Sequence, residues 1–467
     1  MIISSDCIEG KIPPNIEGTV FGNGVGRQRY GEHVYGHWFE GDGHVTSFCY
    51  KEGKVRVRNK FVDQRRYKEN AAANKIVSRG PWTNVNGGVF GNAFRLSKTN
   101  PSNTSVIHHG GKLFALCEAG APVEMGDDLS TIGERTFGDL VGSDGKACTF
   151  SAHYKIDPAT GTVFNHGMVY GKDSSMSLFS WNKNLEMQKI TTVPLEPNTI
   201  QFVHDSCFSK KYSTFFFDSF KADKKGLLSV LLGYKPLGYA FEEHIGEGTR
   251  VVVLNRENGT IVADMKIEDT HTYHFVTGVD RIGDDGEELL DVYFFRYMDR
   301  TGLEEFLRSV YTRTLPDAAS ATLWKYTFDV THKKLISTEQ PFPNALPGEF
   351  PVINGEHEGK EFPVVYAVAV KKGSGFFSAL QRIDAKTGEV KLHDFGAKKY
   401  PGEPVLLEHD GSTFIQVLIF NADTNASEIH IIDDRDFSGH ATAIIKLPIH
   451  VPPQFHTYYA AHHVVDM

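Results

Sequence analysis

Short runs of β-branched and aromatic residues recur along almost the whole chain, and they constrain its fold more than any other feature. Gly, Asp, Asn or Lys residues separate the runs, a pattern typical of strands joined by tight turns. We expect strands within residues 54–62, 105–118, 212–218, 249–267, 289–298, 321–330, 361–370, 413–422 and 428–434. The pattern predicts an all-β protein.

Helical periodicity is weak by comparison. One segment, 300–312, predicts a short amphipathic helix, because its apolar residues fall on one face. These residues are Leu303, Phe306, Leu307 and Val310.

Three hairpin-like units share one arrangement, in which an Asp or Asn precedes a turn glycine by four residues. They are YKIDPATGTVFNHG, VVLNRENGTIVAD and QRIDAKTGEVKLHDFG. The glycine supplies the positive φ that such a turn needs. Units repeated at intervals of tens of residues are typical of β-propeller blades, and six to eight blades are compatible with the pattern. Since no Pro/Ser-rich linker or charge run divides the chain, we expect one domain over residues 1–467.

Composition excludes several classes of protein. A net charge of −9, with no long Lys/Arg block, makes nucleic acid an unsuitable partner. The five cysteines are scattered and form no CxxC pair, which argues against a zinc ribbon or a redox dithiol. Free thiols indicate a reducing compartment, so we expect a cytoplasmic protein. The N-terminus has no signal-peptide pattern as written, and no run of 18 apolar residues occurs.

The segment FKADKKGLLSVLLGYKPLGYAF, residues 220–241, combines clustered apolar residues with lysines. Two interpretations stay open from the sequence. The segment is either a buried amphipathic helix, or an exposed apolar patch that docks on a membrane surface beside Lys221, Lys224, Lys225 and Lys235.

Histidine is the best represented metal-binding side chain, with 21 copies. Several histidines lie in apolar, strand-like surroundings, namely His153, His204, His271, His274 and His456. Each of them, on residue type alone, is more often a hydrogen-bonded core residue than a ligand. No HExxH motif or facial-triad spacing selects a set of ligands.

The succession of longer fragments resembles the carotenoid cleavage oxygenase family. GTVFGNGVG is similar to the family's glycine-rich opening strand, and HWFEGDGHVTSF to its W/F-F-D-G-D-G block. PSNTSVIHHGGKLFALCEAGAPVEM resembles the next block. The fragments SAHYKIDPATG, FVHDSCFS, YHFVTGVD, EFPVIN, GEPVLL and VPPQFH then follow in the family's order.

This resemblance implies a fold and a metal. The fold would be all-β, a single seven-bladed β-propeller with loops and short helices forming a cap over the iron face. The cofactor would be Fe(2+), held by four neutral imidazoles that match His153, His204, His274 and His456.

Two of these matches depart from the family's pattern. Thr277 and Gly278 stand where the family has Asn-Ala, although the register still favours His274 over His271. Gln454 and Thr457 replace glycines around His456. The alternatives for that fourth ligand are His450, His462 and His463.

The resemblance also implies residues around the metal. Glu118, Glu349 and Glu403 match the glutamates that accept hydrogen bonds from ligand histidines. Thr104 matches a position near the open coordination site, where it would tune O2 binding.

The expected reaction is cleavage of a C=C bond by O2 to give two carbonyl products. Stilbene-cleaving members hold a phenol with a lysine and a tyrosine, whose places are taken here by Cys117 and by the stretch 78–84, SRGPWTN. We therefore expect an apolar polyene, a carotenoid or apocarotenoid, with Trp82, Phe90 and Phe94 lining a tunnel or the core. The alternatives are a stilbenoid or phenylpropanoid substrate, and a non-catalytic binding propeller. Location would be cytoplasmic or at a membrane surface, or plastid if a transit peptide has been removed.

Overall fold

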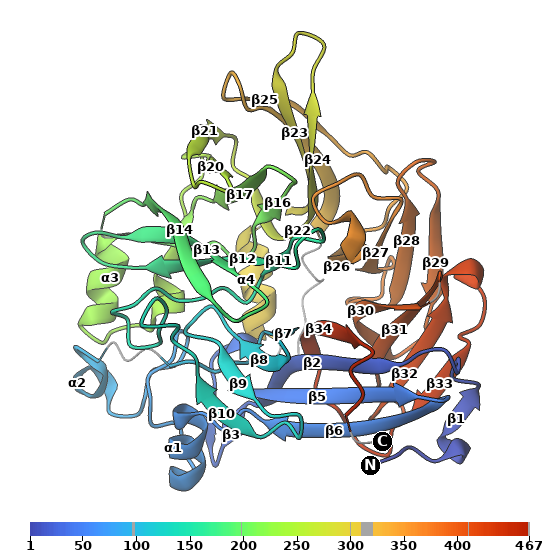
Figure 1. Ribbon diagram of the computed structural model, residues 1–467. Coiled ribbons are helices and arrows are strands. Elements are labelled where there is room, and N and C mark those ends of the chain that lie inside the picture. The colour runs from blue at the N-terminus through green and yellow to red at the C-terminus, as the bar shows by residue number, and fades with distance from the viewer. Residues whose placement is uncertain (96–98, 198, 299, 310–320, 410, 466–467) are drawn as a thin grey trace.

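The computed structural model describes residues 1–95, 99–197, 199–298, 300–309, 321–409 and 411–465. Strands predominate in it, and the described segments contain four short α-helices. Figure 1 shows the sheets arranged around a common centre, with β34, β7, β11, β16, β22, β26 and β30 nearest to that centre.

Four of the sheets have four strands each, in the order in which their strands pair. The first contains β34 (Gln454–Ala461), β2 (Gly18–Arg27), β5 (Asp42–Lys51) and β6 (Lys54–Phe61). The second contains β7 (Ser105–His109), β8 (Lys112–Leu116), β9 (Val123–Met125) and β10 (Thr131–Glu134). The third contains β11 (Lys155–Ile156), β12 (Val163–Val169), β13 (Ser175–Trp181) and β14 (Met187–Pro194). The fourth contains β16 (Cys207–Phe208), β17 (Tyr212–Phe217), β20 (Thr249–Asn255) and β21 (Ile261–Ile267).

Two further sheets are larger. One contains β22 (His271–Ile282), β23 (Glu288–Tyr297), β24 (Ala321–Asp329), β25 (Lys334–Glu339), β26 (Gly348–Val352), β27 (Val364–Ala369), β28 (Ala379–Asp384) and β29 (Val390–Asp394). Its two halves are joined at a single pair, Ala321 with Gly348. The other contains β30 (Lys399–His409), β31 (Ser412–Asn421), β32 (Ala426–Asp433), β33 (Ala443–Lys446) and β1 (Ile8–Gly10).

Smaller elements lie between these sheets. The short strands are β3 (Arg29–Tyr30), β4 (His33–Val34), β15 (Ile200–Gln201), β18 (Phe220–Ala222) and β19 (Phe241–Glu243). The helices are α1 (Arg65–Ala73), α2 (Gly88–Asn92), α3 (Lys224–Leu231) and α4 (Arg300–Ser309). The 3-10 turns are η1 (Ser5–Cys7), η2 (Trp38–Glu40), η3 (Leu237–Ala240), η4 (Gly355–His357) and η5 (Asp434–Asp436). Within the described ranges, no helix is long and apolar enough to cross a bilayer.

The three predicted hairpins form as expected. Their turn glycines, Gly161, Gly259 and Gly388, have φ values of 69°, 75° and 71°. Each glycine lies in the turn between two paired strands. A residue with a Cβ would adopt these positive φ values only with strain. The expected strand runs also contain strands, so the all-β prediction is confirmed.

Segments from opposite ends of the sequence share two sheets. β34 pairs antiparallel with β2, with Tyr458 opposite Phe21, and β1 pairs with β33. The first and last parts of the described chain therefore hold each other in place, and β34 brings His456 opposite Asn23.

The core is divided among the interfaces between neighbouring sheets. Val20 and Phe48 of one sheet pack with Ile429 and Ile445 of the next. Their burial fixes the angle between the sheets, since apolar side chains on both faces must interdigitate.

The helix predicted at 300–312 is α4. Leu303 and Leu307 are buried as expected, whereas residues 310–312 lie outside the described residues. These leucines pack in one cluster with Tyr297 of β23 and Leu323 of β24, so α4 packs against these two strands.

Residues 220–241 fold into β18, α3 and η3, and the segment is neither wholly buried nor wholly exposed. Val230 is buried, while Leu228 and Tyr234 are 55% and 68% exposed. Lys221 does not join a basic rim as the patch interpretation supposed, because its ammonium group pairs with Glu196 and Glu247 at a buried position.

The prediction for two aromatic residues was wrong. Phe90 is 96% exposed and Phe94 is 72% exposed, so neither lines an enclosed space or belongs to the core. Both lie in or next to α2, which contacts the end of α3 where the Phe94 N–H donates to the Leu231 carbonyl at 2.8 Å.

Candidate metal centre

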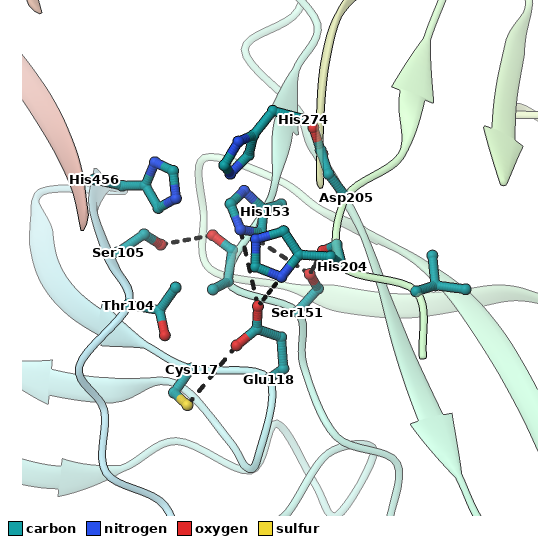
Figure 2. Close-up of polar contacts among 12 residues, drawn as sticks. Thr104, Ser105, Cys117, Glu118, Ser151, His153, His204, Asp205, His274 and His456 are labelled. Carbon is teal, nitrogen blue, oxygen red and sulfur yellow. Dashed lines mark hydrogen bonds and ion pairs between the residues drawn. The ribbon is translucent and has the colours of Figure 1, made fainter. Parts of the chain in front are cut away.

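Four histidines from distant parts of the sequence meet near the centre of the structure. One ring nitrogen from each of His153, His204, His274 and His456 lies within 4.8 Å of the others. Figure 2 shows the four imidazoles facing one another above Glu118. All four sit in predominantly buried surroundings, so their mutual approach is built into the fold.

Irregular backbone aims these side chains inward. His153 precedes β11, and His204 lies in the connection between β15 and β16. His274 and His456 belong to strands β22 and β34, but each lies at a shift in the strand register. Such bulges re-aim side chains, which explains how regular strands can present ligands toward the same point.

Hydrogen bonds between segments fix the loops that carry two of the histidines. The Ser105 hydroxyl donates to the Ala152 carbonyl at 2.6 Å, and the Ser151 hydroxyl donates to the His204 carbonyl at 3.2 Å. These bonds join β7 to the segment before His153, and that segment to the His204 connection.

Each predicted glutamate lies against a histidine of the cluster. His274 Nδ1 donates to Glu349 at 2.6 Å, and His456 Nδ1 donates to Glu403 at 2.8 Å. Glu118 lies 2.9 Å from His204 Nδ1 and 3.8 Å from His153 Nε2.

The electrostatics of the cluster follow from burial and from these carboxylates. Burial, together with the neighbouring imidazoles, lowers the pKa of His153 well below its usual value. Burial also lowers the pKa of His204, and the Glu118 carboxylate offsets part of this effect. For His274, burial again lowers the pKa, but Glu349 outweighs it and the net shift is upward. Burial raises the pKa of Glu118, yet its approach to His204 leaves the pKa below the ordinary value.

The donor set suits a transition metal. Nε2 of His153 and Nε2 of His274 are buried and have no hydrogen-bond partner among the described residues. Where Nδ1 donates to a carboxylate, the imidazole must present Nε2 with its lone pair. Neutral nitrogen ligands of this kind suit iron, copper or zinc more than magnesium or calcium.

Thr104 and Cys117 lie near Glu118, below the histidines in the view of Figure 2. The Thr104 hydroxyl donates to the Asn103 side chain at 3.1 Å, and Thr104 is nearly buried. Cys117 Sγ lies 3.9 Å from the Glu118 carboxylate. Burial raises the pKa of this thiol to about 12, so it stays protonated and uncharged at neutral pH.

Sequence reasoning missed two residues of the site. Asp205 is buried and accepts the Phe275 N–H at 3.0 Å, which ties the His204 connection to β22 next to His274. Phe350 has a φ of 55°, a strained value for a bulky residue, and its ring lies 5.3 Å from His274. An aspartate directly after a histidine, in FVHDSCF, was the available signal for the first. Nothing in the sequence marks the second.

The alternative histidines lie elsewhere among the described residues. His271 contacts Asp218 and Glu243, and the ring centroid of His463 lies 4.2 Å from that of His108. His450 and His462 pack against Phe420 and His409 respectively.

A pocket opens beside His204. Its lining combines aromatic side chains with the polar or charged groups of Asp205, Asp218, Thr270, Thr272 and Arg300. The aromatic walls are Phe202, Phe216, Phe220, Tyr273 and Phe275.

Comparison with known proteins places most of the chain in one family. Residues 3–461 match the family model described as retinal pigment epithelial membrane protein. An apocarotenoid-15,15'-oxygenase of Synechocystis is 27% identical, over 97% of this chain and 92% of its own length. A carotenoid 9,10(9',10')-cleavage dioxygenase 1 of Phaseolus vulgaris is 22% identical, over 91% of this chain and 80% of its own length. A resveratrol cleavage oxygenase 1 of Botryotinia fuckeliana is 23% identical, over 96% of this chain and 81% of its own length.

Solved structures agree with the sequence matches. The cobalt-substituted apocarotenoid oxygenase of Synechocystis superposes with a TM-score of 0.87 at 25% identity. The alignment covers 99% of this chain and 95% of that one.

Proposed function

The chain belongs to the retinal pigment epithelial membrane protein family, which is the carotenoid oxygenase family that its sequence resembles, and we propose on that premise which reaction it performs. The protein is an iron(II) dioxygenase that cleaves a C=C bond of an apolar conjugated polyene, a carotenoid or apocarotenoid, to give two carbonyl products. One observation carries the proposal: four imidazoles converge, and three of them lie within 3 Å of a glutamate.

The proposed architecture is a single domain, residues 1–467, folded as a seven-bladed propeller. Four four-stranded sheets, the two halves of the eight-stranded sheet and the sheet of β30–β33 supply seven units of similar size. Pairing of β34 with β2 would close the circle with strands from both ends of the sequence.

The proposed ligands are His153, His204, His274 and His456. Iron(II) held by these imidazoles would supply the activation of O2 for oxidation of the double bond. Glu349 and Glu403 fix the tautomers and the ring orientations of His274 and His456, because each carboxylate accepts from Nδ1 and so leaves Nε2 free to bind. Glu118 would act on His204 through its charge, since the carboxylate lies 2.9 Å from Nδ1.

Thr104 has a proposed steric and polar role. Its side chain lies on the Glu118 side of the histidines, and its hydroxyl is already held by Asn103. A fixed hydroxyl and methyl group at this place would limit where O2 approaches. Phe350 would do the same for the polyene, since its ring centroid lies 5.3 Å from that of His274 and 5.4 Å from that of His456.

Several observations favour a polyene over a phenol. The relative with 27% identity is by name an apocarotenoid oxygenase, whereas the resveratrol oxygenase is 23% identical. Cys117 is buried and uncharged at the position where a lysine would clamp a phenolate. These points speak against the stilbenoid alternative, and the four-histidine cluster speaks against a non-catalytic propeller.

The polyene would enter from a membrane surface. An apolar patch is formed by Val89, Phe90, Phe94, Leu228, Leu232, Tyr234 and Tyr239, all at least one-third exposed. Figure 1 shows its elements α2 and α3 on the same side of the molecule. The exposed Lys224 and Lys225 lie at the start of α3, where they would meet anionic headgroups.

The test is cleavage of purified polyenes by iron-loaded protein in air. We expect loss of the long-wavelength absorbance, and two carbonyl products by mass spectrometry, for an apocarotenal but not for a hydroxystilbene. Cleavage of the stilbene alone would overturn the substrate assignment. Absence of both reactions in protein that contains one iron per chain would overturn the proposed reaction.

A further inference from the structure

A buried histidine beside the apolar patch has a hydrogen-bond donor without an acceptor. His37 is fully buried, and its Nδ1 accepts the N–H of Phe39 at 3.0 Å. The proton of the neutral ring must therefore lie on Nε2. Nε2 finds no hydrogen-bond partner among the described residues, although it is buried. Such an orphaned donor is costly unless a ligand or water completes it.

The His37 ring stays neutral over the physiological range. Burial lowers its pKa to about 3, and the nearby guanidinium groups of Arg308 and Arg300 contribute in the same direction. The side chain therefore acts as an N–H donor and not as a cation.

Two further donors lie next to this histidine. The ring of Trp82 stacks on His37 with a centroid distance of 4.1 Å, and its Nε1 is buried without a partner in the described part of the chain. Nε1 lies against Gly238, where an added Cβ would come within 2.1 Å of it. Arg308 Nη2 donates to the Gly238 carbonyl at 3.0 Å, so indole and guanidinium flank the same glycine. We call His37, Trp82 and Arg308 the donor cluster.

Hydrogen bonds to Glu40 fix the position of Trp82 and of the next residue, Thr83. Glu40 is buried and accepts both the Trp82 N–H at 2.8 Å and the Thr83 hydroxyl at 2.5 Å. The donor cluster is thus preorganised, which lowers the entropic cost of binding a group there.

Two arginines and two carboxyl groups lie around the donor cluster. Arg308 and Arg300 share one carboxylate, Glu304, at distances of 3.9 Å and 2.9 Å. Glu40 behind Trp82 is a second carboxyl group, and burial raises its pKa above the ordinary value. The two unpaired N–H groups of His37 and Trp82, beside the Arg308 guanidinium, select an acceptor that carries negative charge or a strong dipole.

Contacts connect the donor cluster to both the patch and the metal centre. Arg308 lies over the ring of Tyr239, a patch residue, at 4.4 Å. Phe39, two residues after His37, packs on Phe455 at 5.1 Å, and Phe455 precedes His456. A polyene that enters at the patch would therefore meet the donor cluster on its way to the histidines.

We propose that the donor cluster binds the oxygen-bearing end group of the substrate, a carboxylate or aldehyde. This inference rests on the proposed function and narrows it to apocarotenoids. A polyene offers many nearly equivalent double bonds, and apolar walls discriminate poorly between them. One anchored end group would set which double bond reaches the metal centre.

The experiment measures binding, not turnover. Iron-loaded protein is titrated without O2 with four polyenes of equal chain length that end in a carboxylate, an aldehyde, an alcohol or a methyl group. Binding is followed by the shift of polyene absorbance. The variants are Trp82→Phe, which removes one donor and keeps the ring, and Arg308→Met, which removes the charge. Arg250→Met is the matched control, because this partly exposed arginine pairs with Asp264 on β21, the outermost strand of its sheet.

We expect the wild type to bind the acid and the aldehyde about tenfold or more tightly than the hydrocarbon, in line with charge-assisted hydrogen bonds. Trp82→Phe should reduce this preference for both, Arg308→Met should reduce it most for the acid, and Arg250→Met should leave it unchanged. The preference is a ratio within one preparation, so partial misfolding does not imitate the effect. Equal affinity for all four end groups in the wild type would overturn the inference but leave the proposed function standing. Failure to bind any polyene would overturn both.

Discussion

The imidazole of His456 donates through Nδ1 to the carboxylate of Glu403 at 2.8 Å, although 53 residues separate them in the chain. The second carboxylate oxygen accepts from both the N–H and the hydroxyl of Thr457. Both oxygens of Glu403 are therefore engaged as acceptors. It holds one imidazole in one tautomer, although the surrounding backbone shifts register at this point.

Glu403→Gln should weaken iron binding by about 10- to 100-fold, the usual cost of losing a carboxylate behind a ligand histidine. An amide accepts less strongly and can present its NH2 group to the imidazole instead. The measurement is iron affinity by competition with a chelator. Glu389→Gln, at an exposed position in the β28–β29 turn, is the control and should bind iron as the wild type does.

His274→Gln should abolish stoichiometric iron, whereas His271→Gln should retain it. The two histidines lie on the same strand three residues apart, but one joins the four-imidazole cluster and the other contacts Asp218 and Glu243. Metal analysis of protein produced with excess iron and purified without O2 decides the matter. Loss of iron from both variants, or from neither, would contradict the assignment of ligands.

The double variant Phe90→Ser, Leu228→Ser should lose most of its binding to anionic lipid vesicles. Burial of one such side chain in the interface is worth about 1.5–3 kcal/mol, so each loss should cost about tenfold or more in partition. Vesicle sedimentation measures this. Ile282→Ser is the matched control, because Ile282 is 62% exposed at the β22–β23 hairpin, outside the patch. An equal loss of vesicle binding in Ile282→Ser would contradict a docking surface at the patch, because any exposed apolar residue would then contribute equally.

Stability should depend on pH through His271. Burial lowers the pKa of this imidazole, but the carboxylates of Asp218 and Glu243 outweigh burial and hold the pKa above its ordinary value. A raised folded pKa stabilises the protein fully below the unfolded pKa, about 6.5, and this contribution disappears as pH rises through the folded pKa.

The wild type should therefore exceed His271→Gln in unfolding free energy most strongly below about pH 6.5, with the difference shrinking at higher pH. Denaturant titrations between pH 5.5 and 9 test this, with the exposed His440→Gln as control. A difference that grows with pH would reverse the sign and refute the argument.

Much of the fold could be predicted, because strand periodicity and turn glycines are local signals. Gly161, Gly259 and Gly388 each predict a hairpin, because the turn requires a positive φ that glycine adopts readily. The number of sheets and their order could not be predicted in this way. They depend on pairings between distant strands such as β34 with β2, which no local pattern encodes.

The residues of the candidate site could be predicted from the resemblance to a known family, but not from the pattern of residue types alone. At least 51 residues separate each histidine of the cluster from the next along the chain, so no short motif could select four out of 21. The sequence predicts the apolar patch only in part. The composition of residues 220–241 indicates it, whereas Phe90 and Phe94 are exposed against expectation, because sequence does not tell which side of a short helix faces solvent.

The pairing of β34 with β2 has a consequence for biosynthesis. A chain made from its N-terminus presents His153, His204 and His274 long before residues 454–461 leave the ribosome. During translation the nascent chain therefore carries three imidazoles and an unpaired edge on β2. The complete four-histidine site would therefore form, and bind metal, only after β34 has been synthesised. Chains that terminate before β34 would lack the fourth imidazole.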